Sequence, residues 1–166
     1  MQLSKLLAKH FREVIFGGNW TWSNLQDGVK DVTWQQAVQK VESFHTIAVL
    51  VFHIHYFIEA ILKVLQNQPL DSHDKESFNL PPITSQEDWE SLLTRVWEDA
   101  ELFANLVEQL PEEQFSATFV KEKYGDYYRN IQGVIEHTHY HLGQIVVLKQ
   151  LLSNSSKTKK DAIEKA

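Results

Sequence analysis

Three histidines in this chain have the residue type and the spacing that could hold a metal ion. His137 and His141 are four residues apart near the C-terminal end, and His53 lies nearer the middle of the chain. On an α-helix, residues i and i+4 are neighbours with Cβ atoms ~5–6 Å apart, so two imidazoles at this spacing can reach one ion. A third ligand is needed, and three neutral imidazoles that leave one position open are typical of catalytic zinc sites.

The segment around His137 must be helical for that pairing to form. As a β-strand, its period of two would place His137, His139 and His141 on one face. The surrounding apolar residues instead recur at helical spacing, and no proline interrupts them. Gly133 and Gly143 weaken a helix by ~1 kcal/mol each relative to alanine, which is too little to overturn the pattern. We therefore expect a helix on which His139 points away from the other two.

The third ligand is expected from a long helix at residues 44–66, which contains three histidines. A rotation of 100° per residue places His45 and His55 on the polar side of this helix and His53 on its apolar side. His45 would also lie ~12 Å along the axis from His53, too far to share an ion. The sequence therefore favours His53, with zinc or nickel as the ion. Because ligand imidazoles must be deprotonated, we expect metal affinity to rise with pH through the ordinary histidine range.

Four further residues are candidates for a pocket or for the shell around the ligands. His10 falls on the apolar stripe of the first helix, where it is a hydrogen-bonded core histidine, a fourth ligand or a substitute for His53. Asn130 and Gln144 lie on the same helical edge as the C-terminal pair and could orient the ligand rings. Tyr56 completes the set of candidate pocket residues.

Other interpretations of the histidines stay open. Glu42 with His45, and Glu136 with His139, have the Glu-x-x-His spacing of ferritin-like di-iron bundles. Those motifs must project into the core, whereas His45, Glu136 and His139 map to polar faces. The ion could also be structural, tying two helices together in a non-catalytic dimer. Finally, histidines on an apolar face can be hydrogen-bonded core residues that bind no metal.

The elements that would position the histidines are amphipathic helices. Apolar residues recur at helical spacing in residues 3–15, 44–66, 84–107 and 127–152. Thr84 and Glu87 have capping-box spacing at the start of the third of these helices.

A long connection, marked by prolines, joins the second and third helices. These features predict an all-α fold, a four-helix bundle with one long crossover connection. Residues 1–152 would form a single domain, and residues 153–166, rich in serine and lysine, a flexible tail.

Composition excludes several classes of function. With 16 basic and 22 acidic residues the net charge is −6, which argues against a nucleic-acid partner or an anionic membrane surface. The chain has no cysteine, which excludes disulfides, cysteine-ligated zinc, iron–sulfur clusters and a thiol nucleophile of its own. The longest charge-poor run, residues 46–58, is shorter than the ~20 residues that cross a bilayer. We expect a cytoplasmic protein.

The motifs around the three histidines resemble the DinB/YfiT-like metalloenzyme family. The matching segments are Leu50-Val51-Phe52-His53-Ile54 and His137-x-x-x-His141-Leu-Gly-Gln-Ile, and the likeness extends over residues 3–152. Residues 16–22, Phe-Gly-Gly-Asn-Trp-Thr-Trp, resemble one bacterial branch of that family.

The resemblance implies a four-helix bundle with a long crossover and one divalent metal held by His53, His137 and His141. It also implies a homodimer. Members of the family include bacillithiol transferases and mycothiol-dependent isomerases. The resemblance thus implies a metal-dependent transferase or hydrolase that acts on or with a low-molecular-weight thiol. Because this chain lacks cysteine, such a thiol must come from solution.

Overall fold

The computed structural model describes residues 2–163, with side chains described as far as residue 154. Its long helices are α1 (Leu3–Phe16), α4 (Ile47–Leu65), α5 (Gln86–Gln109) and α6 (Tyr127–Ile163). Shorter elements are the helices α2 (Leu25–Val29) and α3 (Trp34–Val38) and the 3-10 helices η1 (Glu76–Phe78), η2 (Glu112–Ser116) and η3 (Glu122–Tyr124). No β-strand occurs in the described residues, so the prediction of an all-α fold is confirmed.

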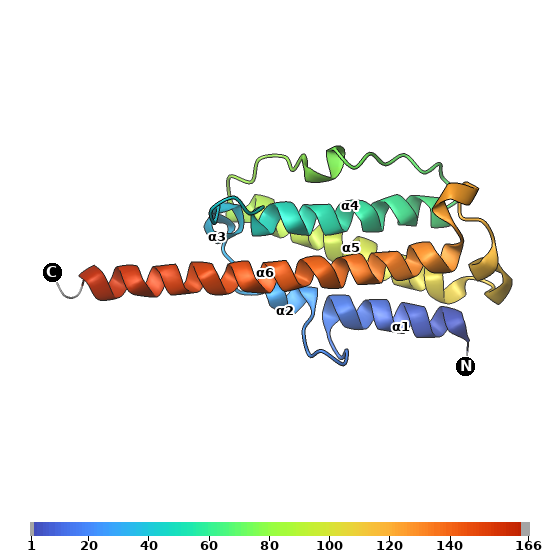
Figure 1. The fold of residues 1–166 in the computed structure, drawn as a ribbon, viewed down its shortest axis with the longest axis horizontal. Coiled ribbons are helices and arrows are strands. Elements are labelled where there is room, and N and C mark those ends of the chain that lie inside the picture. The colour runs from blue at the N-terminus through green and yellow to red at the C-terminus, as the bar shows by residue number, and fades with distance from the viewer. Residues whose placement is uncertain (1, 164–166) are drawn as a thin grey trace.

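The long helices pack side by side (Figure 1). Helix α1 contacts α5 and α6, and α4 contacts the same two helices. Helices α4 and α5 run in the same direction, and the chain between them returns along the outside of α4 (Figure 1). Parallel neighbours need such a long return, which here includes η1, and η1 packs against α4. This connection therefore passes over the helix that carries His53.

Side-chain caps fix where the two central helices begin. The Thr46 hydroxyl accepts a hydrogen bond from the amide three residues ahead and starts α4. At the start of α5, the Ser85 hydroxyl accepts from the Asp88 amide, and the Asp88 carboxylate accepts from the Ser85 amide. The sequence placed this capping box one residue earlier, at Thr84 and Glu87, and that assignment is wrong. The amide and hydroxyl of Thr84 also donate to the Asp88 carboxylate, which therefore accepts three hydrogen bonds.

Two helix ends differ from those expected. Helix α4 begins at Ile47 rather than near Phe44, because Thr46 is its cap, so His45 precedes the helix. Helix α6 continues to Ile163, past the end expected near Leu152. The flexibility expected for residues 153–166 stays a prediction, and the last three of those residues lie outside the described part of the chain.

The core lies between the long helices and contains mostly aliphatic and aromatic side chains. Fully buried members come from every long helix and include Phe11, Ile54, Trp89, Phe103 and Ile145. Among described residues, α4 is the one helix long and apolar enough to cross a membrane. However, 67% of its most apolar window is buried inside the fold, as in the core helix of a soluble protein.

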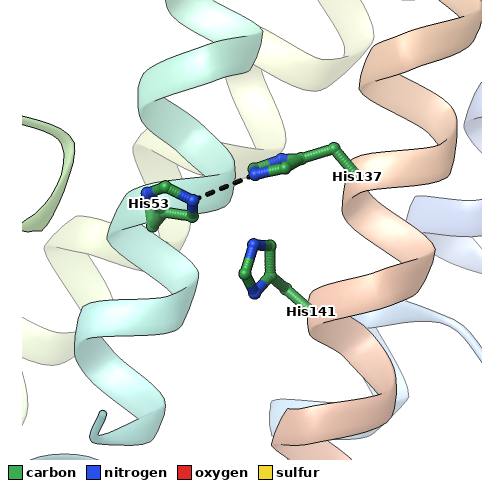
Figure 2. A group of neighbouring side chains, drawn as sticks. All are labelled: His53, His137 and His141. Atoms are coloured by element: carbon green, nitrogen blue, oxygen red, sulfur yellow. Dashed lines mark hydrogen bonds between the residues drawn. The ribbon is translucent and has the colours of Figure 1, made fainter. Parts of the chain in front are cut away.

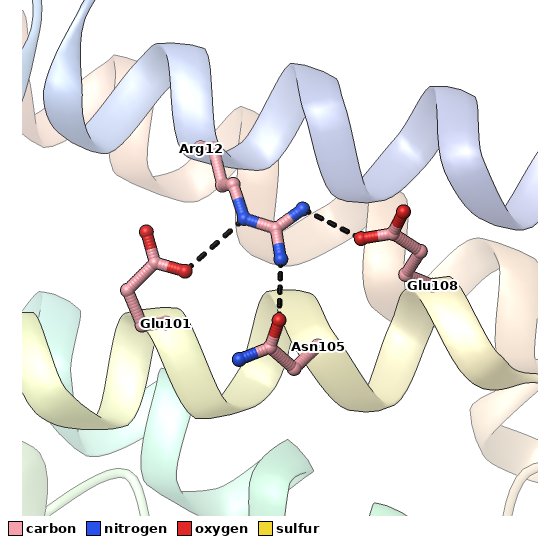
Figure 3. Close-up of polar contacts among 4 residues, drawn as sticks. All are labelled: Arg12, Glu101, Asn105 and Glu108. Atoms are coloured by element: carbon pink, nitrogen blue, oxygen red, sulfur yellow. Dashed lines mark hydrogen bonds and ion pairs between the residues drawn. The ribbon is translucent and has the colours of Figure 1, made fainter.

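A polar cluster on the surface ties α1 to α5 (Figure 3). The Arg12 guanidinium donates to Glu101 at 3.1 Å, to Glu108 at 2.9 Å and to Asn105 at 2.6 Å. The acceptors are spaced along one side of α5, so one planar guanidinium engages two successive turns of the neighbouring helix. Charge-assisted hydrogen bonds of this kind are stronger than neutral ones, although solvent screens an exposed cluster.

We expect Arg12→Met to lower the free energy of unfolding by about 1 kcal/mol, because it keeps the aliphatic stem and removes all three hydrogen bonds. Urea unfolding of the metal-free protein measures this. The matched control is Arg95→Met, since Arg95 is exposed on α5 and has no ion pair within the described residues. Equal losses in the two variants, or a loss that does not shrink in 1 M salt, would contradict the assigned role.

Candidate metal centre

The three histidines that the sequence selected lie together between α4 and α6 (Figure 2). Each offers one ring nitrogen, and these three nitrogen atoms all lie within 4.8 Å of one another. His53 projects from α4, whereas His137 and His141 project from successive turns of α6. His53 and His141 are buried, and His137 is half-buried. The group could therefore bind a divalent metal ion.

The spacing of the rings suits a single ion. The Nε2 atoms of His53 and His137 are 3.0 Å apart, and the three pairs of ring centroids lie 4.5–4.8 Å apart. Around a tetrahedral zinc ion with Zn–N bonds of ~2.0–2.1 Å, ligand nitrogens are ~3.3 Å apart. The donor set and the closest separation both fit that geometry.

Hydrogen bonding fixes which nitrogen of His53 carries its proton. Its Nδ1 lies 2.9 Å from the Ser77 hydroxyl oxygen. That hydroxyl donates its own hydrogen to the carbonyl of Asp74 at 2.7 Å, so it can only accept from the imidazole. His53 is therefore protonated at Nδ1, and its Nε2 presents a lone pair to the centre of the cluster.

The same reasoning applies to His141. Its Nδ1 lies 2.8 Å from the Gln144 side-chain oxygen, and a carbonyl oxygen only accepts hydrogen bonds. His141 therefore also carries its proton on Nδ1 and leaves Nε2 free. Gln144 occupies the ring-orienting position that the sequence suggested for it.

His137 differs from the other two ligand candidates. Within the described residues its buried Nδ1 has no hydrogen-bond partner. Without an ion, its Nε2 can donate to the free Nε2 of His53 at 3.0 Å. No protein group therefore fixes the tautomer of His137, which makes it the least constrained member of the cluster.

Burial keeps the rings neutral. Desolvation, followed by the nearby His141, lowers the pKa of His53 to about 4. Desolvation, His141 and His53 together lower the pKa of His137 to about 4. Desolvation also lowers the pKa of His141, against the opposing effect of its bond to Gln144. All three rings are thus uncharged at neutral pH, so each can offer one ring nitrogen to a metal ion, as metal binding requires.

Two phenylalanines form the apolar surroundings of the cluster. Phe78 stacks on His53 with ring centroids 4.0 Å apart, and Phe57 meets His53 and His137 edge-on at 5.1 Å and 4.8 Å. Phe78 and Ser77 both belong to η1, on the long connection. Sequence analysis did not identify either of them, because a serine and a phenylalanine within a long connection have no periodicity that indicates where they pack.

His137 also borders a cavity of about 270 Å³ between α4 and the start of α6. Asn130 lines this cavity and also a larger adjoining cavity of about 730 Å³, and its role in a substrate pocket stays a prediction. The Asn130 side-chain amide donates to the carbonyls of Tyr124 and Asp126. Unlike Gln144, it makes no hydrogen bond to a ligand ring.

The remaining candidates lie elsewhere. His10 is exposed, with its ring 6.3 Å from that of His139, and it does not belong to the cluster, so its assignment as a fourth ligand is wrong. Tyr56 accepts a hydrogen bond from the His73 amide at 2.7 Å and so anchors the long connection to α4.

Two other histidines of this region lie outside the cluster. His55 was expected on a polar face but is buried against α5, where it lies 2.7 Å from an Asp99 carboxylate oxygen. His45 is exposed and stacks on Phe78. The di-iron interpretation also fails, because the three-histidine group is the one cluster of metal-ligating residues found among the described residues.

We expect Ser77→Ala to weaken zinc binding about tenfold, because His53 would lose the partner that fixes its tautomer. Competition with a chromophoric chelator measures the affinity. Ser116→Ala is the control, since the Ser116 hydroxyl also donates to a carbonyl three residues earlier in a 3-10 helix but contacts no histidine. Unchanged affinity in Ser77→Ala would contradict the orienting role.

The lowered pKa values move the pH range in which protons compete with the metal. We expect zinc affinity to fall as the pH drops from about 6 toward 4 and to change little above about pH 7, because protonation of the folded protein requires a more acidic solution. This corrects the expectation of a rise through the ordinary histidine range. Chelator competition across this range tests it, with circular dichroism at each pH.

That control is needed because the same shifts reduce stability in acid. Unfolded histidines, with a pKa near 6.5, bind protons that the folded metal-free protein excludes, so its stability falls as the pH drops below about 6.5. A steep rise in affinity between about pH 6.5 and 8, in protein that stays folded, would contradict the lowered pKa values.

Comparison with known proteins places the chain in a family. A family model described as the DinB superfamily matches residues 19–145, a segment that includes all three clustered histidines. No curated protein and no solved structure gives a significant match. Since the matched segment covers more than half of the chain, this protein belongs to the DinB superfamily.

Proposed function

We propose that this protein is an enzyme that depends on one divalent metal ion, zinc or nickel, held by His53, His137 and His141. Three observations support the proposal: the three ring nitrogens converge, two of the rings are held as Nδ1-protonated tautomers, and burial keeps all three neutral. Family membership is compatible with such a site.

The observation that favours a catalytic over a structural ion is the number of ligands. Structural zinc sites are closed by four protein ligands, whereas catalytic sites have three and an open position. Among the described residues no fourth histidine or carboxylate joins the group, and His137 borders a cavity. A small molecule in that cavity would be next to the cluster.

We propose that the reaction is a group transfer or hydrolysis that acts on or with a low-molecular-weight thiol. A divalent ion would supply Lewis acidity that makes a thiol or water nucleophilic near neutral pH. Ser77 and Gln144 would hold the proton on Nδ1 of their histidines, and Phe57 and Phe78 would exclude water from the rings. The chain supplies no cysteine, so the thiol would be a diffusible molecule.

The finer features of the fold and setting are also proposals. Because each long helix contacts two others, we propose a four-helix bundle with one long crossover, forming a single domain over residues 1–152.

We propose a homodimer in the bacterial cytoplasm, with no nucleic-acid or membrane partner. Exposed apolar side chains at Phe44, Tyr140 and Val147 offer a surface that a second copy could cover, and the net charge of −6 disfavours polyanions.

A second candidate function is a non-catalytic dimeric bundle in which the ion is structural or absent. The observation that favours it is the direct hydrogen bond between the Nε2 atoms of His53 and His137, which satisfies both atoms without any ion. Elemental analysis distinguishes the metal-free form of this candidate from the enzyme, and binding of a small thiol to the metal-loaded protein distinguishes the form with a structural ion.

We expect untagged protein, purified without chelators, to contain about one zinc or nickel ion per chain, and His137→Ala to contain none. The control is His139→Ala, which removes a histidine from the same helix outside the cluster. A metal-free wild type, or unchanged metal content in His137→Ala, would refute the site. Metal-loaded protein that binds no small thiol would refute the thiol chemistry.

A further inference from the structure

We propose that the groove running along α6 from Arg129 to His137 binds a substrate that carries a carboxylate, with Arg129 as its anchor. This inference rests on the proposed function, since it places the reacting end of the substrate at the histidine cluster. It adds the chemical class of the substrate and a residue that determines specificity.

The groove follows one line of side chains on α6. Arg129, Gly133 and His137 are spaced four residues apart, so they lie on successive turns of one helical face and span ~12 Å along the axis. All three line the cavity of about 270 Å³. An extended molecule that spans this distance could therefore reach the guanidinium at one end while its other end lies at the histidines.

Gly133 keeps the floor of this groove open. A Cβ atom built at Gly133 would meet no other atom within 4 Å, so packing does not require a glycine there. Glycine is among the weakest residues in a helix interior. A position in which a larger residue would fit, and would favour the helix, is instead left without a side chain between Arg129 and His137.

Arg129 lies at the rim of the groove and forms no ion pair there with the described residues. It is exposed, and within the described residues no carboxylate forms an ion pair with it. Its stem crosses Gly125, where a Cβ would lie 2.8 Å from the Arg129 Cδ atom. It also belongs to the first turn of α6, where the helix macrodipole disfavours a cation. The Asp126 carboxylate caps this turn and accepts a hydrogen bond from the Arg129 amide at 2.8 Å. No ion pair within the described residues uses the Arg129 guanidinium, so it is available to an anion in the groove.

The other residues that line the groove offer one hydrogen-bond acceptor and apolar walls to a ligand. Both hydrogens of the Asn130 amide are donated to backbone carbonyls, so its side-chain oxygen is left to accept from a ligand hydroxyl or amide. The walls at Phe57, Ile61 and Val134 are apolar.

The charge of the ligand is limited by the adjoining cavity. Asp74 and Glu76 accompany Lys75 there, so the surroundings hold little excess positive charge. One guanidinium, with these carboxylates in the adjoining cavity, suits a singly charged carboxylate better than a doubly charged phosphate.

The test uses two thiols of equal length that differ in charge, 5-mercaptopentanoate and 5-mercaptopentan-1-ol. Protein loaded with cobalt(II) is titrated with each thiol, and the visible spectrum of the cobalt reports binding. We expect the wild type to bind the acid at least tenfold more tightly than the alcohol.

The Arg129→Gln variant isolates the charge. We expect it to lose the preference for the acid and to bind the alcohol as the wild type does, while Arg129→Lys keeps part of the preference because it retains a charge but not the planar fork. Arg95→Gln is the matched control, since it removes the same charge from an exposed site on α5, and we expect it to keep the full preference.

A second pair of variants tests the groove itself. Gly133→Leu places a side chain on the groove floor and should weaken both thiols at least tenfold. Gly143→Leu is the control, because Gly143 is on the same helix, has the same open space at its Cβ position and lines a different cavity. Both substitutions replace glycine by a stronger helix former.

The outcomes separate this inference from the proposed function. If the wild type binds both thiols equally, or if Arg129→Gln weakens both to the same extent, the carboxylate anchor is wrong and the metal site stands. If neither thiol changes the cobalt spectrum, both proposals are wrong. If Gly133→Leu binds both thiols as the wild type does, the substrate does not occupy this groove.

Discussion

The structure depends on how three imidazole rings are accommodated in an apolar interior. Burial makes protonation costly, and each ring raises that cost for its neighbours, so the rings stay neutral. The buried lone pairs of neutral rings need a hydrogen-bond donor or a cation as a partner. His53 and His141 have Nδ1 partners that turn their Nε2 atoms toward the centre. A divalent cation could accept the lone pairs of all three rings at once.

The long connection between α4 and α5 contributes to the site as well as to the topology. Because α4 and α5 run in the same direction, the chain must return along the outside of α4 (Figure 1). On this return, η1 supplies the hydroxyl of Ser77 to His53 and the ring of Phe78 to its face. Tyr56 binds the backbone at His73 and holds the return close to α4. The topology thus creates the shell around His53.

The two sides of the histidine cluster have different chemical character. Toward η1 and Gln144 the rings are hydrogen-bonded and covered, which fixes their orientation. Toward the start of α6, His137 lies beside open space and lacks a partner for Nδ1. Such an asymmetry, rigid on one side and accessible on the other, is what a site needs if it is both to hold an ion and to admit a small molecule.

Helical periodicity favoured His53, His137 and His141, because the face of a helix on which a residue lies depends only on its position in the sequence. The same reasoning failed for His10 and His55. Periodicity says which residues share a face, but it does not say which faces a neighbouring helix covers. His55 lies on a face that α5 covers, and Asp99 on that helix provides its partner. His10 lies at the edge of its stripe and is exposed.

The sequence by itself determined the helices, the all-α class, the absence of any thiol in the chain and the pairing of His137 with His141, because all of these depend on composition or on contacts within one turn of a helix. Tertiary structure alone decided that His53 meets this pair, that Ser77 and Phe78 cover it and that Arg129 and Gly133 line a groove beside it. These contacts join residues from separate elements, and their formation depends on how whole helices pack, which no local pattern of residues specifies.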